Sequence, residues 1–271
     1  MVNGTGRLFR VPLAAPSLTA PSLTASSLIA PSLTASSLIA PSLIAPSLIA
    51  IDTGPLTRCN NDHGFSRDGQ DILFSSHRDH GAEIFRLPRT GSPELVSAEL
   101  VSPEPPSWFH GTAPDCSGMT YAAAREGRRT VDIYTKSWDR PEQRLTGGEG
   151  HSDGPEYAAD GTKIFFNNDR TGRAQIWVMA SDGTNQRPLF SDTQVNWFPH
   201  PSPDGQHLLY LAYPPGTQGH PRDLHVALCL ATPDGTNRRR VVELTGGQGT
   251  LNVPSWSPDS AEFAFMRFAT P

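Results

Sequence analysis

The chain has 271 residues, a formal net charge of −5, and 37% hydrophobic and 8% aromatic residues, which is typical of a soluble globular protein with a buried core. The charge is spread along the chain, and the arginine run 238–240 lies beside a turn, so we expect no nucleic-acid binding. No run reaches the about 18 apolar residues that a membrane helix needs. Three cysteines without ligand spacing favour a reducing compartment over a disulfide scaffold.

The first 58 residues are predicted to hold half of a repeat unit, interrupted by a low-complexity insert. Residues 1–14 contain GRLFRVPL, which is predicted as a third strand, and GPLTR at 54–58 is predicted as a fourth. Between them, residues 15–50 hold seven pentads of the form A-[PS]-S-L-[TI]. Proline recurs among these pentads and breaks any helix, so this insert is predicted to be disordered, with no function assigned.

The remainder, residues 51–271, repeats one unit five times. Turns such as SPDG recur with starts 47, 45, 44 and 55 residues apart, and β-rich runs separated by polar links follow each of them. With the strand that leads into the turn, each unit has four predicted antiparallel strands. A period in the forties with β content is typical of propeller blades. The turns begin at Ser66, Ala113, Ala158, Ser202 and Ser257.

The aspartates of these turns are predicted to be structural rather than catalytic. An aspartate in a tight turn caps it by accepting hydrogen bonds from nearby backbone N–H groups, and glycine supplies the positive φ that hairpin turns need. The residues concerned are Asp68, Asp115, Asp160, Asp204 and Asp259.

Several phrases resemble the TolB family of WD-like β-propellers. They are LTRCNNDHG, DGPEYAADGTKIFFNNDRTGRAQIW, NWFPHPSPDG and GGQGTLNVPSWSPDS. The resemblance runs from about residue 6 to residue 268, apart from the insert. Within the family, the chain is similar to a cytoplasmic-type branch whose members mostly lack an established activity. It implies an all-β fold, a β-propeller of four-stranded antiparallel blades.

The two ends of the chain leave the blade count open. The C-terminal copy, PSWSPDSAEFAFMRF, supplies only a first and a second strand. The two half-units could complete one another and give five blades. Alternatively, an N-terminal stretch is missing, because MVNGTG resembles the tail of a segment that precedes this point in relatives. We favour the second reading, a six-bladed plan that lacks part of its N-terminus.

Polar residues recur just before each turn, on the predicted innermost strands. These strands surround the central channel of a propeller, so we expect their polar side chains to meet at one face of it. The predicted ligand-binding residues are Asn61, Asp62, His63, His110, Asp153, Glu156, Asn196, His200 and Asn252.

Three of these residues, His63, His110 and His200, are candidate ligands for a divalent metal, because imidazole nitrogen binds such ions. His63 and His110 precede their turns by three residues, whereas His200 precedes its turn by two. Side chains alternate along a strand, so His200 is expected on another side unless Pro199 introduces a bulge. Hydrated polar residues that only cap strand ends are the alternative.

Residues 213–223, YPPGTQGHPRD, form an insert in the fourth repeat. An insert on the rim of a propeller can overhang the channel, so this one is predicted to act as a lid or as a partner contact. Its His220 is expected to be solvated, as are the other histidines outside the inner strands.

The favoured function is a binding or scaffold module that uses the channel face for a protein or for a small molecule, which could be a carbohydrate. The alternative is a metal-dependent lyase or hydrolase that acts on saccharides through the channel histidines. Oligogalacturonate lyases use a propeller of this general kind, but their ligand motif is not matched here. The N-terminus has no signal peptide, so we expect a cytoplasmic protein, or a periplasmic one if the natural start lies upstream.

Overall fold

The computed structural model describes residues 9–10, 49–88, 99–127, 130–147 and 149–268. Within these ranges the strands form four four-stranded antiparallel sheets and one two-stranded sheet. No helix in these ranges has the length and apolar character needed to cross a membrane.

Each four-stranded sheet is one blade, built from four strands that are consecutive in the chain. Blade 1 contains β3 (Cys59–Phe65), β4 (Asp71–Arg78), β5 (Gly81–Pro88) and β6 (Glu99–Leu100). Blade 2 contains β7 (Ser107–Thr112), β8 (Gly118–Ala123), β9 (Asp132–Ser137) and β10 (Gln143–Arg144). Blade 3 contains β11 (Ser152–Tyr157), β12 (Lys163–Asn168), β13 (Gln175–Ala180) and β14 (Arg187–Pro188). Blade 4 contains β15 (Val195–Pro201), β16 (Leu208–Tyr213), β17 (Leu224–Ala231) and β18 (Arg239–Gly246).

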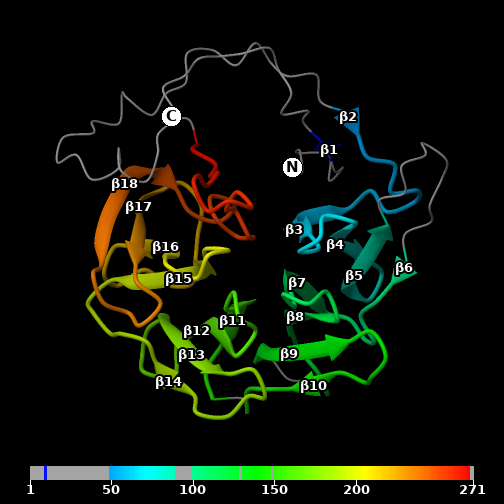
Figure 1. Ribbon diagram of the computed structural model, residues 1–271, viewed down its shortest axis with the longest axis horizontal. Helices are drawn as coiled ribbons and strands as arrows, with labels where there is room; N and C mark the ends of the chain where they lie inside the picture. Colours follow the sequence, from blue (N-terminus) through cyan, green and yellow to red (C-terminus); the bar gives the residue numbers. More distant parts are fainter. Residues whose placement is uncertain (1–8, 11–48, 89–98, 128–129, 148, 269–271) are drawn as a thin grey trace.

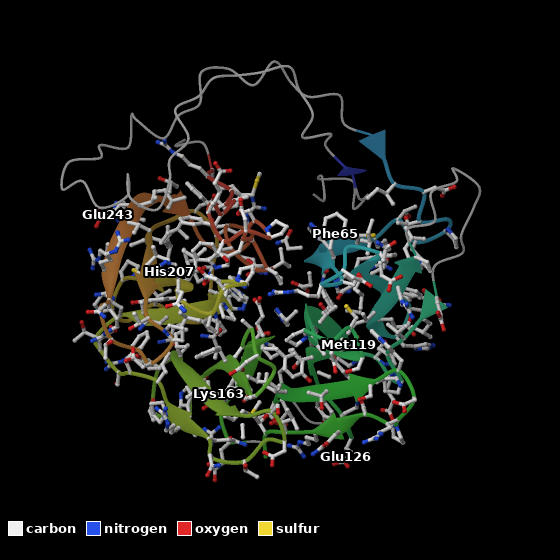
Figure 2. The ribbon with its side chains drawn as sticks, viewed as in Figure 1. Phe65, Met119, Glu126, Lys163, His207 and Glu243 are labelled. Atoms are coloured by element: carbon white, nitrogen blue, oxygen red, sulfur yellow. The ribbon has the colours of Figure 1, made fainter. Side chains whose placement is uncertain are left out.

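The blades are arranged around a common centre, with β3, β7, β11 and β15 innermost (Figure 1). Neighbouring inner strands contact one another, β3 with β7, β7 with β11 and β11 with β15. Figure 2 shows that side chains extend into this centre. The predicted β-propeller of four-stranded antiparallel blades is therefore confirmed.

The predicted number of blades is wrong. The described residues form four complete blades rather than five, and a six-bladed plan is not seen. The C-terminal repeat contributes only one isolated antiparallel bridge, Trp256 to Phe263. At the other end, β1 (Phe9–Arg10) pairs with β2 (Ile49–Ala50) in a separate two-stranded sheet, so the described residues of the two half-units do not share a blade.

Most of the predicted N-terminal half-unit and of the low-complexity insert lies outside the described residues. The strand that pairs with β1 is β2, which lies at the end of the predicted insert 15–50. The predicted fourth strand at 54–58 is instead a turn followed by an irregular segment before β3. The predicted disorder of the insert stays a prediction.

The C-terminal segment still links blade 4 to blade 1 on the inside of the ring. On one side, the indole N–H of Trp256 donates to the backbone oxygen of His200 at 2.9 Å. On the other side, Gly249 lies against the Asn61 side chain. The Arg67 guanidinium also donates to the Pro203 oxygen at 3.1 Å, which joins the turns of blades 1 and 4.

The predicted role of the turn aspartates is confirmed. In each of the five turns, the aspartate Oδ1 accepts a hydrogen bond at 2.9–3.1 Å from the backbone N–H two residues later. Each turn is therefore stabilised by a local hydrogen bond between its aspartate and the residue that follows the turn.

The hydrophobic core lies between adjacent blades. Phe165 and Ile176 of blade 3 pack with Leu208 and Tyr210 of blade 4 in one cluster of buried residues. Similar clusters join blade 1 to blade 2, and blade 2 to blade 3. Burial of apolar area, at about 25 cal/mol per Å², is the main stabilisation of such contacts.

One buried side chain also ties two blades together by hydrogen bonds. Asn167 of β12 is fully buried. Its amide donates to the Asn196 backbone oxygen at 2.7 Å, and its Oδ1 accepts from the Phe198 N–H at 2.7 Å. Both partners lie on β15 of the next blade. These two hydrogen bonds therefore link neighbouring blades, whose strands do not pair with one another.

We expect Asn167→Ala to lower the free energy of unfolding by about 2–4 kcal/mol, because a buried N–H and a buried carbonyl each lose their partner. Urea unfolding followed by circular dichroism measures this loss. Gln143→Ala, at an exposed position of β10, is the control and should cost less than about 0.5 kcal/mol. Equal costs for the two variants would show that Asn167 does not hold the blades together.

Candidate functional site at the inner strands

Every inner strand of the four blades contains a β-bulge at the positions where the sequence places its polar residues. The pairing register with the second strand shifts between Cys59 and His63, Phe109 and Gly111, Asp153 and Glu156, and Trp197 and His200. A bulge leaves residues unpaired and turns the following side chains to a new direction. The four inner strands can therefore aim polar side chains at a common region.

The bulge in β15 settles the direction of His200. Phe198, inside the bulge, has a φ of 56°, which is unusual for a bulky residue. The Asn167 hydrogen bond to its N–H helps to hold this backbone. The bulge includes Pro199, as the sequence suggested, and it brings His200 to Glu156 of the preceding blade.

The carboxylate of Asp153 is paired with His110 of the neighbouring blade. Oδ1 lies 3.0 Å from His110 Nε2 and also accepts a hydrogen bond from the Gly154 N–H at 2.8 Å. Burial raises the pKa of Asp153, but His110 and His151 outweigh it and hold that pKa well below its usual range. Burial likewise lowers the pKa of His110, and Asp153 overcomes it, so the net shift is upward. Both shifts favour the charged forms of the two side chains.

The second oxygen of Asp153 faces two further histidines. Oδ2 lies 3.7 Å from His151 Nε2 and 3.7 Å from His220 Nε2. His220 belongs to the insert at 213–223, and its ring packs against Trp197 and Phe198 with centroids 4.5 and 5.2 Å away. Three histidines from three parts of the chain thus surround one carboxylate.

Glu156 and His200 form a second buried pair. Glu156 Oε2 lies 2.6 Å from His200 Nδ1, and His200 Nε2 lies 3.0 Å from the Leu251 backbone oxygen. A carbonyl can only accept, so Nε2 carries a proton and Nδ1 shares the second proton with the carboxyl group. Burial raises the pKa of Glu156, against the opposing effect of His200.

Asp62 joins the same electrostatic cluster from blade 1. Its Oδ2 accepts a hydrogen bond from the Asn60 amide at 2.7 Å. Burial raises the pKa of Asp62 to about 6, while the nearby charge of His110 opposes that shift. We refer to Asp62, His110, Asp153, Glu156 and His200 as the inner-strand site.

The other predicted ligand-binding residues have different surroundings. Burial lowers the pKa of His63 to about 4, so this histidine is neutral at pH 7. Asn61 lies against Gly249 of the C-terminal segment. Asn252 accepts the Gly249 N–H at 2.8 Å, and Asn196 donates to Asp192 and Gln175. These contacts are those of loop and blade packing, and a ligand role for the four residues stays a prediction.

The predicted metal set, His63, His110 and His200, gains no support from this geometry. His110 and His200 each pair with a carboxylate from β11. In the part of the chain that the structure describes, no group of three or more His, Cys, Asp and Glu side chains could hold a metal ion. The metal and the enzyme alternative built on it stay predictions.

The sequence reasoning missed two residues that contact this site, His151 and His220. His151 lies directly before β11, and only its spacing of two from Asp153 could have indicated that both point the same way. His220 was expected to be solvated. The insert brings it back over the inner strands, where its Nδ1 is hydrogen-bonded to the Gln248 side chain. Nothing local in the sequence signals that return.

Comparison with known proteins is consistent with this architecture. A family model described as "TolB beta propeller domain" matches residues 64–222. An uncharacterised protein of Agrobacterium fabrum is 43% identical over 221 residues, which cover 80% of this chain and 73% of that protein.

Two solved structures are similar in fold. One, from Agrobacterium tumefaciens, carries a provisional TolB name; it has a TM-score of 0.79 and 41% identity, and the match covers 83% of this chain and 80% of that one. The other is TolB from Acinetobacter baumannii, with a TM-score of 0.60 and 17% identity over 73% of this chain and 46% of that one. At that identity the second likeness concerns the fold alone.

The His110–Asp153 pair predicts a pH-dependent cost for Asp153→Asn. The lowered pKa of Asp153 stabilises the fold above its unfolded pKa of about 3.9, and the raised pKa of His110 stabilises it fully only below about 6.5. We therefore expect a cost of about 3 kcal/mol near pH 5.5 that shrinks as the pH rises through the raised pKa of His110. Urea unfolding across this pH range measures it.

The control for this measurement is Asp182→Asn. Asp182 is an exposed turn aspartate whose pKa is lowered by hydrogen bonds from Thr184, with no histidine partner among its hydrogen bonds. Its cost should stay constant above about pH 6. A cost of Asp153→Asn that grows with pH, or that follows the control, would contradict the charged pair.

Proposed function

Since this chain belongs to the TolB β-propeller family, we propose that it is a binding or scaffold module that takes its ligand at the inner-strand site. The family supports a module of this kind without fixing a ligand or an activity. The ligand can be a small molecule or a segment of a partner protein. Which of the two binds depends on the side chains of the site.

The observation that carries this proposal is the convergence of five ionisable side chains from the inner strands of all four blades. The side chains of His110 and His200 are 5% and 4% exposed, and those of Asp153 and Glu156 are 15% and 14% exposed. Burying charged pairs gives little net stability, because desolvation offsets most of the attraction. Ionisable groups with perturbed pKa values, gathered in one place, are typical of functional sites.

A second feature supports a ligand rather than a purely structural network. His110 Nδ1 is buried and makes no hydrogen bond of good geometry among the described residues, although the Asn252 backbone lies near the ring. Buried polar atoms in native proteins are nearly always bonded to protein or to water. An unmatched nitrogen inside a charged cluster is consistent with a site that is completed by another molecule.

We expect a thermal-shift screen with amino acids, small carboxylates, nucleosides and sugars to find at least one compound that raises the melting temperature of the protein. Glu156→Gln and Asp153→Asn should abolish that shift. Lys163→Ala, on the exposed start of β12 and away from the centre (Figure 2), should retain it.

Two results would count against a binding site at the inner strands. In one, active compounds stabilise the two site variants and the parent protein equally. In the other, no compound acts and the variants only melt at a lower temperature, as expected of a purely structural network.

A further inference from the structure

A groove lies beside the inner-strand site, between the insert at 213–223 and blades 3 and 4. Its volume is about 640 Å³, within the range of small-molecule sites. His151 and His220, which face Asp153, both line it. The groove therefore exposes two imidazoles that face the buried carboxylate, while Asp153 itself is not among its lining residues.

The insert that forms one wall of this groove is fixed in place. The His220 ring packs against Trp197 and Phe198, and its Nδ1 is hydrogen-bonded to Gln248. The backbone N–H of Gln248 donates in turn to the Pro221 oxygen at 3.2 Å. Because the wall is already in place, a ligand would not have to order it on binding.

The gap between Asp153, His151 and His220 has a specific chemistry. Oδ2 of Asp153 lies 3.7 Å from Nε2 of each histidine, which is too long for a hydrogen bond. The Nδ1 of His220 faces the side-chain carbonyl oxygen of Gln248, which only accepts, so Nε2 of the neutral ring is an acceptor, whereas His151 Nε2 can donate. A hydroxyl group donates one hydrogen bond and accepts two, so it can accept from His151 and donate to either the carboxylate or His220.

The remainder of the groove mixes donors with acceptors. Arg173 offers N–H groups, Asp169 offers a carboxylate, and Thr193 offers a hydroxyl that can donate and accept. The Thr217 hydroxyl already donates to the Pro214 oxygen and can accept from a ligand. Trp197 also lines the groove, is 3% exposed, and has an indole N–H without a partner among the described residues. A simple anion would meet Asp169 and a simple cation would meet Arg173, whereas neutral hydroxyl groups match both.

We propose that this groove binds a small polyhydroxylated molecule, a sugar or a polyol, with one hydroxyl held between Asp153, His151 and His220. This inference rests on the proposed binding function and names its ligand class. A water molecule in the gap could accept from His151 and donate to both Asp153 and His220. A sugar hydroxyl that replaces this water keeps the bond from His151 and one of the two donated bonds, while the remaining hydroxyls bond to the groove.

Saturation-transfer NMR and calorimetric titration test the proposal with glucose, galactose, myo-inositol and glycerol as probes. Succinate and glycine betaine serve as comparison probes without hydroxyl groups. We expect at least one hydroxylated probe to bind saturably and the comparison probes not to bind. His220→Ala and His151→Ala should each weaken binding about tenfold, the loss of one hydrogen bond to a partly buried group.

Two further variants complete the test, one as a control outside the groove and one on its rim. His207→Ala removes a histidine that stacks on Trp256, outside the residues lining the groove, and should leave binding unchanged. Arg173→Ala changes an exposed rim residue of the groove, is expected to fold normally, and should weaken binding. It keeps the proposal testable if His220→Ala does not fold.

The outcomes separate the ligand class from the binding function. Binding of succinate or betaine that His220→Ala removes, without binding of any hydroxylated probe, would overturn the ligand class and leave the binding module intact. Sugar binding that His151→Ala, His220→Ala and Arg173→Ala all leave unchanged would place the ligand elsewhere and overturn the groove. Absence of binding by all six probes would also overturn the proposed ligand class, while the broader thermal-shift screen decides the binding function independently.

Discussion

The β-bulge in each inner strand is the distortion on which the arrangement of this site depends. In a regular strand, successive side chains point to opposite faces, and the polar residues of neighbouring blades would diverge. Each bulge breaks that alternation once and turns a histidine or a carboxylate towards the next blade. The pairs His110–Asp153 and His200–Glu156 join different blades for this reason, so the same contacts that build the site also connect blades 2, 3 and 4.

The bulges carry a conformational cost that the surrounding structure must offset. Phe198 adopts a left-handed backbone that costs of order 1–3 kcal/mol for a bulky residue. The buried Asn167 amide, the ring of His220 and the indole of Trp197 all contact Phe198. Strain of this kind persists where the environment fixes it from several sides, and it is common at binding sites. The insert, the bulge and the interblade hydrogen bonds thus form one connected unit around Asp153.

The sequence predicts well what depends on local pattern. The turn aspartates, the strand order within each blade and the polar character of the inner strands follow from repeated short motifs, and the structure contains all of them. The direction of His200 was left open by the sequence, because only the paired structure shows that the bulge at Pro199 occurs. The sequence does not predict the hydrogen bonds of Asn196 to Asp192 and of the Gly249 N–H to Asn252, and a ligand role for the two asparagines stays a prediction.

What the sequence does not predict depends on contacts between distant segments. The blade count is wrong because the pairing of the two ends is a long-range event that no local motif encodes. His220 was missed because the insert returns over the inner strands, where Trp197 and Phe198 hold its ring. The groove exists only as a result of that return.

The most direct test is a high-resolution crystal structure of the protein, alone and soaked with the sugar or polyol that binds most tightly. Our account predicts an ordered oxygen within about 3.2 Å of Asp153 Oδ2, His151 Nε2 and His220 Nε2 in the unsoaked crystal. A ligand hydroxyl should replace this oxygen after soaking. A gap closed by direct contact of either histidine with Asp153, or a ligand bound away from the groove, would contradict the account.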